Sequence, residues 1–443
     1  IEAPSIRRVR LAAVTPAERR GLVDRSSTAT PELRERVREI VEAIRVGGDA
    51  ALADANGQFG GARIDADGTS MPIALDRREL RAARDALPRD LRRALEHMAA
   101  NIERFHAEQV PAREQWVDIA PGIRVGRRWA GLDRVAAYVP GGSAAYPSSV
   151  LMSAIPARLA GVGQFVVASP AGRDGGLSPS LLGAAGLMEV DAFLVMGGAQ
   201  AIAALAHGTE SIQAVDKIVG PGNAWVTQAK LQVFGAVAID MPAGPSEVMV
   251  VADDSADPTH VAADLLSQAE HGPDSPALLV TTSAALIGRV LEEIARQLPT
   301  LPRQEELQAS LRRGAVIVEA TDLDDAIAFV NEYAPEHLSV VVRAEEEGRA
   351  LASIKHAGSL FVGPFAPESA GDYATGSNHV LPTGRLARAF GALGVESFGK
   401  WLQIQHVTRE GLASVRDTVA MVAEAEGLTA HRRAVELRFE ETR

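Results

Sequence analysis

The chain has 443 residues, of which 47% are apolar and 23% are charged, and its net charge is −12 with a pI near 5.4. A large apolar share with charges of both signs excludes extended disorder and predicts two or three domains with substantial cores. The acidic balance and the lack of a basic stripe argue against nucleic-acid binding and favour small-molecule chemistry. The chain has no cysteine, which excludes disulfides, thiolate metal ligands and cysteine nucleophiles.

Neither a secretory signal nor a membrane span is expected. The first residues, IEAPSIRRVR, lack the apolar region of a signal peptide. The longest apolar stretch, residues 181–207, is interrupted by Glu189 and Asp191, which argues against a membrane span. We therefore expect a cytoplasmic protein.

The N-terminal quarter is predicted to be mainly helical. After an N-terminal arm at residues 1–20, Thr30 can cap a helix in which Pro31 takes the first position. Further helices are expected at 77–87 and 91–109, and a strand that enters the first α/β half at 122–129.

From residue 135 to residue 362, apolar runs of strand length alternate with segments of helix length. Continuous β-branched runs, each followed by a helix, are typical of parallel sheets covered on both faces. We therefore predict an α/β fold with two similar doubly wound, incomplete Rossmann-like units, a pattern compatible with duplication. The first unit is predicted to have strands at 135–139, 165–169, 192–196, 217–219 and 237–239, and helices at 148–159, 179–188, 200–206 and 224–234. The second is predicted to have strands at 247–251, 277–281, 315–318, 338–342 and 360–362, and helices at 258–269, 284–297, 323–331 and 344–355.

Three glycine-rich turns follow strands of the first unit, at residues 140–143, 197–200 and 220–223. Each lies at the carboxyl end of a strand and opens a helix, where an open α/β sheet binds ligands and helix amides face an anion. None is G-x-G-x-x-G, and each loop alone is better explained by a tight turn between strand and helix. Three on one edge of a sheet favour a nucleotide.

A second group of polar residues has the composition of a metal site. Gln268 and His271 are three residues apart at the end of the helix predicted at 258–269, which puts them on one face. The long polar loop 369–384 contributes Asp372 and has no core periodicity, as functional loops often have none. With one further histidine these residues can form a zinc site with oxygen and nitrogen ligands. The alternative is that they cap helix ends and turns.

Glu336 and His337 precede the strand predicted at 338–342. A histidine can accept an alcohol proton, and a neighbouring carboxylate can activate water. The alternative is an exposed polar pair at the start of a strand. In a parallel sheet, however, Ser246, this pair and the end of the helix 258–269 all reach the amino edge. We expect this edge to face the nucleotide edge of the first unit across a cleft.

Eight segments in order resemble the histidinol dehydrogenase family: YVPGG, GGAQAIAA, GPGN, DMPAGPSE, LLSQAEH, APEHL, GDYATGSNHVLPT and AEGLTAH. The resemblance covers nearly the whole chain. It implies a zinc-containing, NAD-dependent homodimer that oxidises L-histidinol through L-histidinaldehyde to L-histidine with two NAD. It also implies a C-terminal segment that crosses to the neighbouring subunit.

The resemblance assigns a role to each motif residue. His337 matches the general base and Glu336 the residue that activates water. The expected zinc ligands are Gln268, His271, Asp372 and His431. Further substrate contacts are expected at Ser246, His379 and Glu426, beside His337 and the zinc ligands, and NAD contacts at Tyr138, Gln200 and Asn223.

The same resemblance suggests a domain organisation. Residues 131–244 would form the Rossmann-like NAD-binding domain. Residues 21–130 together with 245–385 would form a discontinuous α/β domain with most zinc and substrate residues. Residues 386–443 are predicted to be a helical segment, too short to fold alone, that contacts the partner subunit.

Two other functions remain open. One is a related enzyme that oxidises another small alcohol, although Ser246, His379 and Glu426 favour histidinol. The other is a metal- or nucleotide-binding module without catalysis, although simple binding does not need Glu336 and His337.

Overall fold

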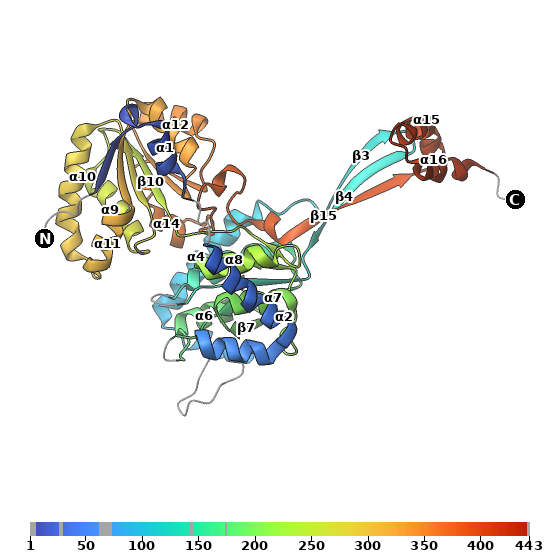
Figure 1. Ribbon diagram of the computed structural model, residues 1–443, viewed down its shortest axis with the longest axis horizontal. Coiled ribbons are helices and arrows are strands. Elements are labelled where there is room, and N and C mark those ends of the chain that lie inside the picture. The colour runs from blue at the N-terminus through green and yellow to red at the C-terminus, as the bar shows by residue number, and fades with distance from the viewer. Residues whose placement is uncertain (1–5, 26–29, 62–72, 142–144, 173–174, 441–443) are drawn as a thin grey trace.

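The computed structural model describes residues 6–25, 30–61, 73–141, 145–172 and 175–440. In these residues, strands form two six-stranded sheets and one three-stranded sheet, as Figure 1 shows. The α/β fold with two doubly wound parallel sheets is therefore confirmed. No helix in the described ranges is long and apolar enough to cross a membrane.

The first sheet is parallel except at one edge, where β2 pairs antiparallel with β7. Its order is β2 (Ala74–Leu75), β7 (Ala192–Val195), β6 (Gln164–Ser169), β5 (Arg134–Tyr138), β8 (Lys217–Val219) and β9 (Ala238–Ile239). One face packs on α2 (Pro31–Phe59), α7 (Gly198–His207) and α8 (Ala224–Val233). The other packs on α3 (Arg77–Asp85), α4 (Arg89–Ala107), α5 (Pro147–Ala160) and α6 (Pro179–Leu187).

The second sheet is parallel throughout. Its order is β1 (Arg7–Arg10), β12 (Ala315–Glu319), β11 (Ala277–Thr281), β10 (Val248–Ala252), β13 (His337–Val341) and β14 (Ser359–Val362). One face packs on α9 (Pro258–Ala269), α10 (Ala284–Gln297) and α11 (Gln304–Gly314). The other packs on α1 (Pro16–Val23), α12 (Leu323–Tyr333) and α13 (Ala344–Ser353).

The two sheets share one strand order. Counted along the chain from β5 and from β10, the five successive strands of each sheet lie in the order 3-2-1-4-5. All residues of β10 and β11 are buried, because helices cover both faces, as the continuous apolar runs predicted. The shared order agrees with the duplication that the sequence pattern suggested.

Two predictions about the N-terminal part were wrong. The expected arm at residues 1–20 contributes β1, which extends the second sheet beside β12, followed by α1. Residues 21–130 were assigned to the domain around the second sheet, yet α2, α3 and α4 pack on helices of the first. Their apolar stripes identify a buried face but not the sheet that buries it.

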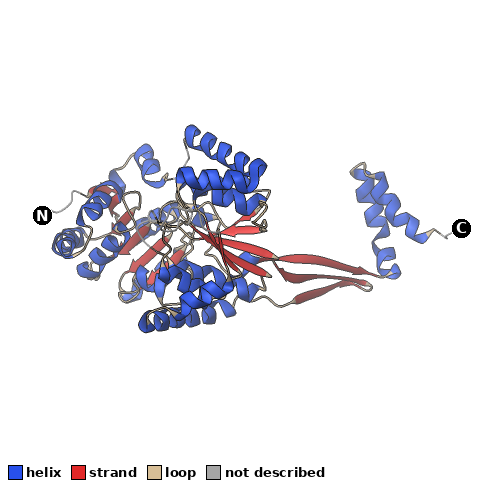
Figure 2. Cartoon of the chain, turned by 90° about the horizontal axis from the view of Figure 1, so that it is seen from below, coloured by secondary structure: helices blue, strands red, loops and turns tan. Residues whose placement is uncertain are grey.

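The third sheet was also missed. The strand expected at 122–129 is β4 (Ile123–Gly131), but it pairs antiparallel with β3 (Glu114–Ala120) and β15 (Gly399–Val407) instead of entering the first unit. The segment 386–443, predicted to be helical, therefore contains a long strand, which follows short 3-10 helices at Leu386–Arg388 and Val395–Phe398. The α-helices α15 (Arg409–Ala425) and α16 (Thr429–Glu436) fit that prediction. Together β3, β4, β15, α15 and α16 form a projecting arm, seen in Figures 1 and 2.

Candidate active site

Polar side chains converge at the amino edge of the second sheet. His337 is the first residue of β13 and lies beside Val248 of β10. The Ser246 hydroxyl donates to Glu336 Oε2 at 2.8 Å, and the backbone N–H of Glu247 donates to the same oxygen at 2.8 Å. The side-chain amide of Gln268, at the end of α9, donates to the carbonyl oxygen of Ser246 at 2.7 Å. The predicted meeting of these segments at one edge is thus confirmed.

His337 is buried with one ring nitrogen engaged and the other free. Its Nδ1 lies 3.2 Å from the carbonyl oxygen of Glu247, an acceptor that selects the tautomer with the proton on Nδ1. Its Nε2 has no hydrogen-bond partner among the described residues and lies 3.7 Å from Asp372 Oδ1. In the neutral imidazole, Nε2 is therefore the atom that offers a lone pair to the site.

Carboxylates surround this imidazole. Glu336 Oε2 lies 3.4 Å and Glu368 Oε1 3.5 Å from His337 Nδ1. Burial lowers the pKa of His337, but the negative charges of Glu336 and Glu368 outweigh it and raise that pKa well above the usual value. Burial, with the charge of Asp372, raises the pKa of Glu368 to about 8. The edge therefore gathers several acidic groups around one imidazole.

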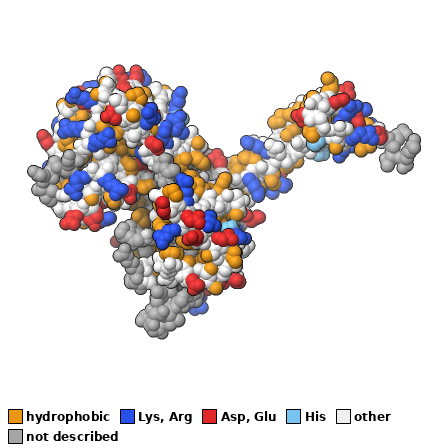
Figure 3. Space-filling view, viewed as in Figure 1, with side chains coloured by type: hydrophobic (Ala, Val, Ile, Leu, Met, Phe, Trp, Pro, Cys, Tyr) orange, Lys and Arg blue, Asp and Glu red, His pale blue; other side chains and the backbone are white. Residues whose placement is uncertain are grey.

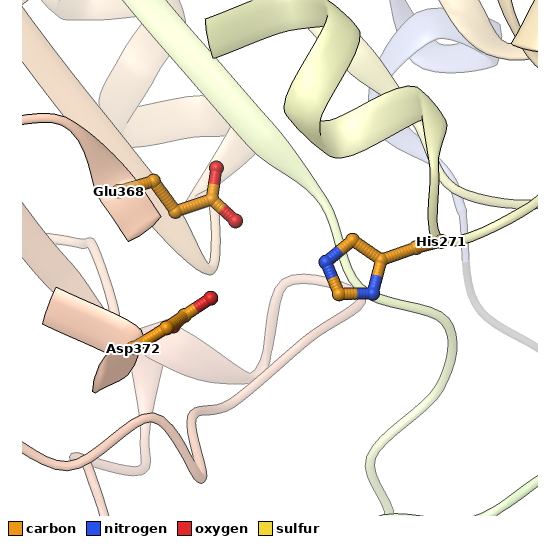
Figure 4. Close-up of side chains that lie close together, drawn as sticks. All are labelled: His271, Glu368 and Asp372. Atoms are coloured by element: carbon orange, nitrogen blue, oxygen red, sulfur yellow. The ribbon is translucent and has the colours of Figure 1, made fainter. Parts of the chain in front are cut away.

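Three of these side chains have the arrangement of metal ligands. One ligand atom each from His271, Glu368 and Asp372 lies within 4.8 Å of the others, and Figure 4 shows the three side chains approaching one another. Gln268 Oε1 and Glu368 Oε2 are buried without a hydrogen-bond partner in the described part of the chain. A buried oxygen without a hydrogen-bond partner destabilises the folded state unless a bound ligand or metal ion contacts it. Such oxygen and nitrogen donors fit zinc or another divalent ion.

The loop that follows Asp372 bridges the two halves. His379 Nδ1 lies 3.2 Å from the carbonyl oxygen of Asp372, and its Nε2 lies 3.1 Å from the hydroxyl of Ser149. Ser149 is in the first turn of α5, which follows β5 and therefore begins at the carboxyl edge of the first sheet. The amino edge of the second sheet thus connects to the carboxyl edge of the first through Asp372 and His379, as the sequence predicted.

The candidate nucleotide residues lie at that carboxyl edge. Tyr138 ends β5, and its hydroxyl accepts from the backbone N–H of Gly198 at 3.1 Å. Gln200 is buried in α7, and its amide donates to Asn56 Oδ1 at 3.3 Å. Asn223 caps α8 by accepting from the backbone N–H of Trp225 at 3.1 Å. Of the first glycine-rich loop, Gly142 and Ser143 lie outside the described residues.

Gly220 shows why glycine is needed at this edge. It follows β8, has a φ of +102°, and a Cβ there would come within 2.2 Å of the carbonyl oxygen of Tyr138. Strands β5 and β8 are neighbours whose connections leave in opposite directions along the sheet. This topological switch point is where open α/β sheets bind ligands.

Two predicted site residues lie far away within the chain. Glu426 follows α15 and His431 is in α16, and both are exposed at the end of the projecting arm (Figure 1). A single chain therefore brings together Gln268, His271 and Asp372 but not His431.

Comparison with known proteins decides the family. The family model described as histidinol dehydrogenase matches residues 23–439. The chain belongs to the histidinol dehydrogenase family. It is 46% identical to histidinol dehydrogenase of Parasynechococcus marenigrum over 96% of this chain and 95% of that protein. The protein of the same name from Bacillus cereus is 45% identical over 92% and 93%. The crystal structure of histidinol dehydrogenase from Elizabethkingia anophelis has a TM-score of 0.90, with 37% identity over 99% of both chains.

As a member of the histidinol dehydrogenase family, the chain is an oxidoreductase of histidine biosynthesis. One residue at its candidate site was missed from the sequence. Glu368 lies four residues before Asp372 in α14 (Glu368–Tyr373), so one helical turn places both on one face. The sequence pattern predicts a non-helical loop that begins at residue 369, one residue after Glu368. The helical spacing of the two acids was the available signal.

Proposed function

We propose that the chain is a cytoplasmic, zinc-containing, NAD-dependent homodimer that oxidises L-histidinol through L-histidinaldehyde to L-histidine. The observation that carries this proposal is the free Nε2 of buried His337, beside Asp372 and next to the anchored carboxylate of Glu336. Simple binding needs no base, so this arrangement favours catalysis over a non-catalytic module.

The two oxidations need different proton-transfer steps from the protein. Loss of hydride from an alcohol requires loss of its hydroxyl proton, which His337 Nε2 is placed to accept. The aldehyde has no such proton and must first add water, for which the Glu336 carboxylate is the base. NAD, when bound, supplies the hydride acceptor. Both steps in one enclosed site protect the reactive aldehyde from bulk water.

The metal would be held by Gln268, His271 and Asp372, with His431 from a neighbouring subunit as the fourth ligand. Zinc, when bound, supplies a cation that attracts the imidazole and amine nitrogens of the substrate. The carboxylates around His337 raise its pKa, and a positive charge beside them would lower it toward the range that a general base needs. Ser246, His379 and Glu426 complete the proposed substrate contacts.

The proposed cofactor site is the carboxyl edge of the first sheet. Tyr138, Gln200 and Asn223 belong to three segments that meet there, and close approach of backbone is possible only because Gly220 lacks a side chain. The hydroxyl of Tyr138 and the amide of Gln200 already take part in hydrogen bonds. Asn223 is exposed and the most accessible of the three.

The proposed homodimer is supported by the projecting arm. No residue of α16 is buried, and Met421, Val422, Leu428 and Leu437 on the helical end are exposed. Figure 3 shows hydrophobic side chains on this end of the molecule, away from the body. Exposed apolar patches mark interaction sites. A second copy of the chain would cover them and receive Glu426 and His431.

The stoichiometry of the reaction tests the function. We expect two NADH for each L-histidinol consumed, because one site performs both oxidations. The measurement is NADH absorbance against histidinol loss, with a panel of other small alcohols as the control. A yield of one NADH for each histidinol would show that the reaction stops at the aldehyde. Faster turnover of another alcohol would favour the alternative of a related enzyme with a different substrate.

Removal of the metal tests the ligand assignment. We expect a chelator to abolish turnover and Zn²⁺ to restore it, because Gln268 Oε1 and Asp372 need a cation partner. His271→Ala should lower the zinc content measured by atomic absorption, whereas His207→Ala, at the end of α7 on the first sheet, should not. Full activity of a metal-free protein would overturn the assignment.

A further inference from the structure

The chain crosses three times between the body around the first sheet and the body around the second sheet, and the three connections lie side by side. The first passage leads from α1 to α2 and includes Arg25. The second leads from β9 to β10 and ends at Glu247. The third is the loop after α14, which includes Gly384 and continues to Phe398 in the core of the first half. Contacts at this spot therefore influence how the halves are joined.

Arg25 and Glu247 form a buried, bidentate ion pair where these connections meet. Arg25 Nε donates to Glu247 Oε2 at 2.6 Å and its Nη2 to Oε1 at 2.7 Å. The guanidinium also lies 3.4 Å from the ring centroid of Tyr333. The side chains are only 11% and 2% exposed. The backbone N–H of Gly384 donates to Glu247 Oε1 at 3.2 Å, so all three passages contribute.

The backbone of Glu247 holds both proposed catalytic side chains. Its N–H donates to Glu336 Oε2, and its carbonyl oxygen accepts from the backbone N–H of His337 and faces His337 Nδ1, each at 3.2 Å. The carbonyl contact selects the tautomer that leaves Nε2 free. A shift of Glu247 would therefore move the carboxylate and rotate or release the imidazole.

We infer that Arg25 and Glu247 are positioning residues, which fix the Glu247 backbone so that Glu336 and His337 keep their reactive geometry. This inference rests on the proposed function of those two residues. A buried ion pair gives little net stability compared with an apolar pair of the same shape. A planar two-point contact does restrict orientation, since guanidinium and carboxylate fit in one plane. Placement is thus a better account of this pair than stability alone.

The experiment compares Arg25→Met, Arg25→Lys and Glu247→Gln in the full-length, metal-loaded protein. Arg25→Met should lower kcat about 100-fold, since misplacement by about 1 Å costs that much, with little change in KM for NAD. The deuterium isotope effect on kcat should rise with histidinol labelled at its alcohol carbon, because hydride transfer becomes limiting. Arg25→Lys should recover part of kcat, and Glu247→Gln should resemble Arg25→Met.

A matched control is Arg19→Met. Arg19 lies on α1 of the same segment, donates to Glu332 at 2.6 Å and faces the ring of Phe329, but it does not contact Glu247. It should lower the melting temperature and leave kcat and the isotope effect unchanged. Wild-type kcat and isotope effect in folded Arg25→Met would overturn the inference. If Arg25→Met fails to fold, Glu247→Gln, which keeps the shape of the side chain, decides by the same readouts.

His337→Asn, measured in parallel, separates the two proposals. Full turnover of His337→Asn would overturn the proposed function and this inference with it. An inactive His337→Asn beside a fully active Arg25→Met and Glu247→Gln would overturn only the positioning role.

Discussion

His337→Asn is expected to lose roughly 10²- to 10⁴-fold in kcat for histidinol oxidation, the usual contribution of a general base. Asparagine preserves the size of the side chain and can still donate to the Glu247 carbonyl, but it offers no basic nitrogen in place of Nε2. Zinc should remain bound, since Gln268, His271 and Asp372 are unchanged. The measurement is steady-state turnover together with metal content.

Glu336→Gln is the matched control for this variant. It alters the adjacent carboxylate and keeps the Nε2 of His337, so the first oxidation should persist while hydration of the aldehyde fails. The expected yield is one NADH for each histidinol. Equal turnover of His337→Asn and the unmodified protein, with zinc bound in both, would show that the base is another group.

Mixing two inactive variants should restore activity if the site is shared between subunits. His337→Asn retains His431, and His431→Asn retains His337, so each mixed dimer has one intact site and one doubly altered site. Random exchange makes half of the dimers mixed, and recovery should reach about one quarter of the unmodified activity. The measurement is turnover after partial unfolding and refolding of differently tagged subunits.

The control for complementation mixes His337→Asn with Asp372→Ala. Both changes lie in the same body of the chain, where His337 Nε2 is 3.7 Å from Asp372 Oδ1. Mixed dimers then have no intact site and should stay inactive. Absence of recovery in the first mixture, despite mixed dimers isolated through their two tags, would assign His431 a role inside its own chain or none.

Local signals explain the elements that were predicted well. The bounds of α9 and α10 agree with the sequence prediction, because each begins at a side-chain cap, Asp257 and Ser283, that accepts from the first turn. Buried strands such as β11 were recognisable because parallel strands covered on both faces are continuously apolar. Caps and periodicity act over a few residues and can be read without a partner.

Long-range pairing explains the errors. Strand β15 pairs with β4, more than 260 residues earlier, and most residues of both strands are partly or fully exposed. Such strands show no buried stripe, so β15 was included in a helical tail. Helices α2 to α4 showed their apolar stripes, but a stripe does not state which sheet it will cover.

The candidate site divides in the same way. The amino acid sequence determined which chemical groups are available: an imidazole next to a carboxylate, oxygen and nitrogen donors without thiols, and glycine-rich turns after strands. The tertiary structure decided which groups meet, including Glu368 beside Asp372 and the Arg25–Glu247 pair behind His337. Composition and local spacing are properties of short segments, whereas these contacts depend on strand order and on three chain passages between the halves. The tertiary structure also places Glu426 and His431 on the projecting arm, too far from the candidate site of their own chain to contact it.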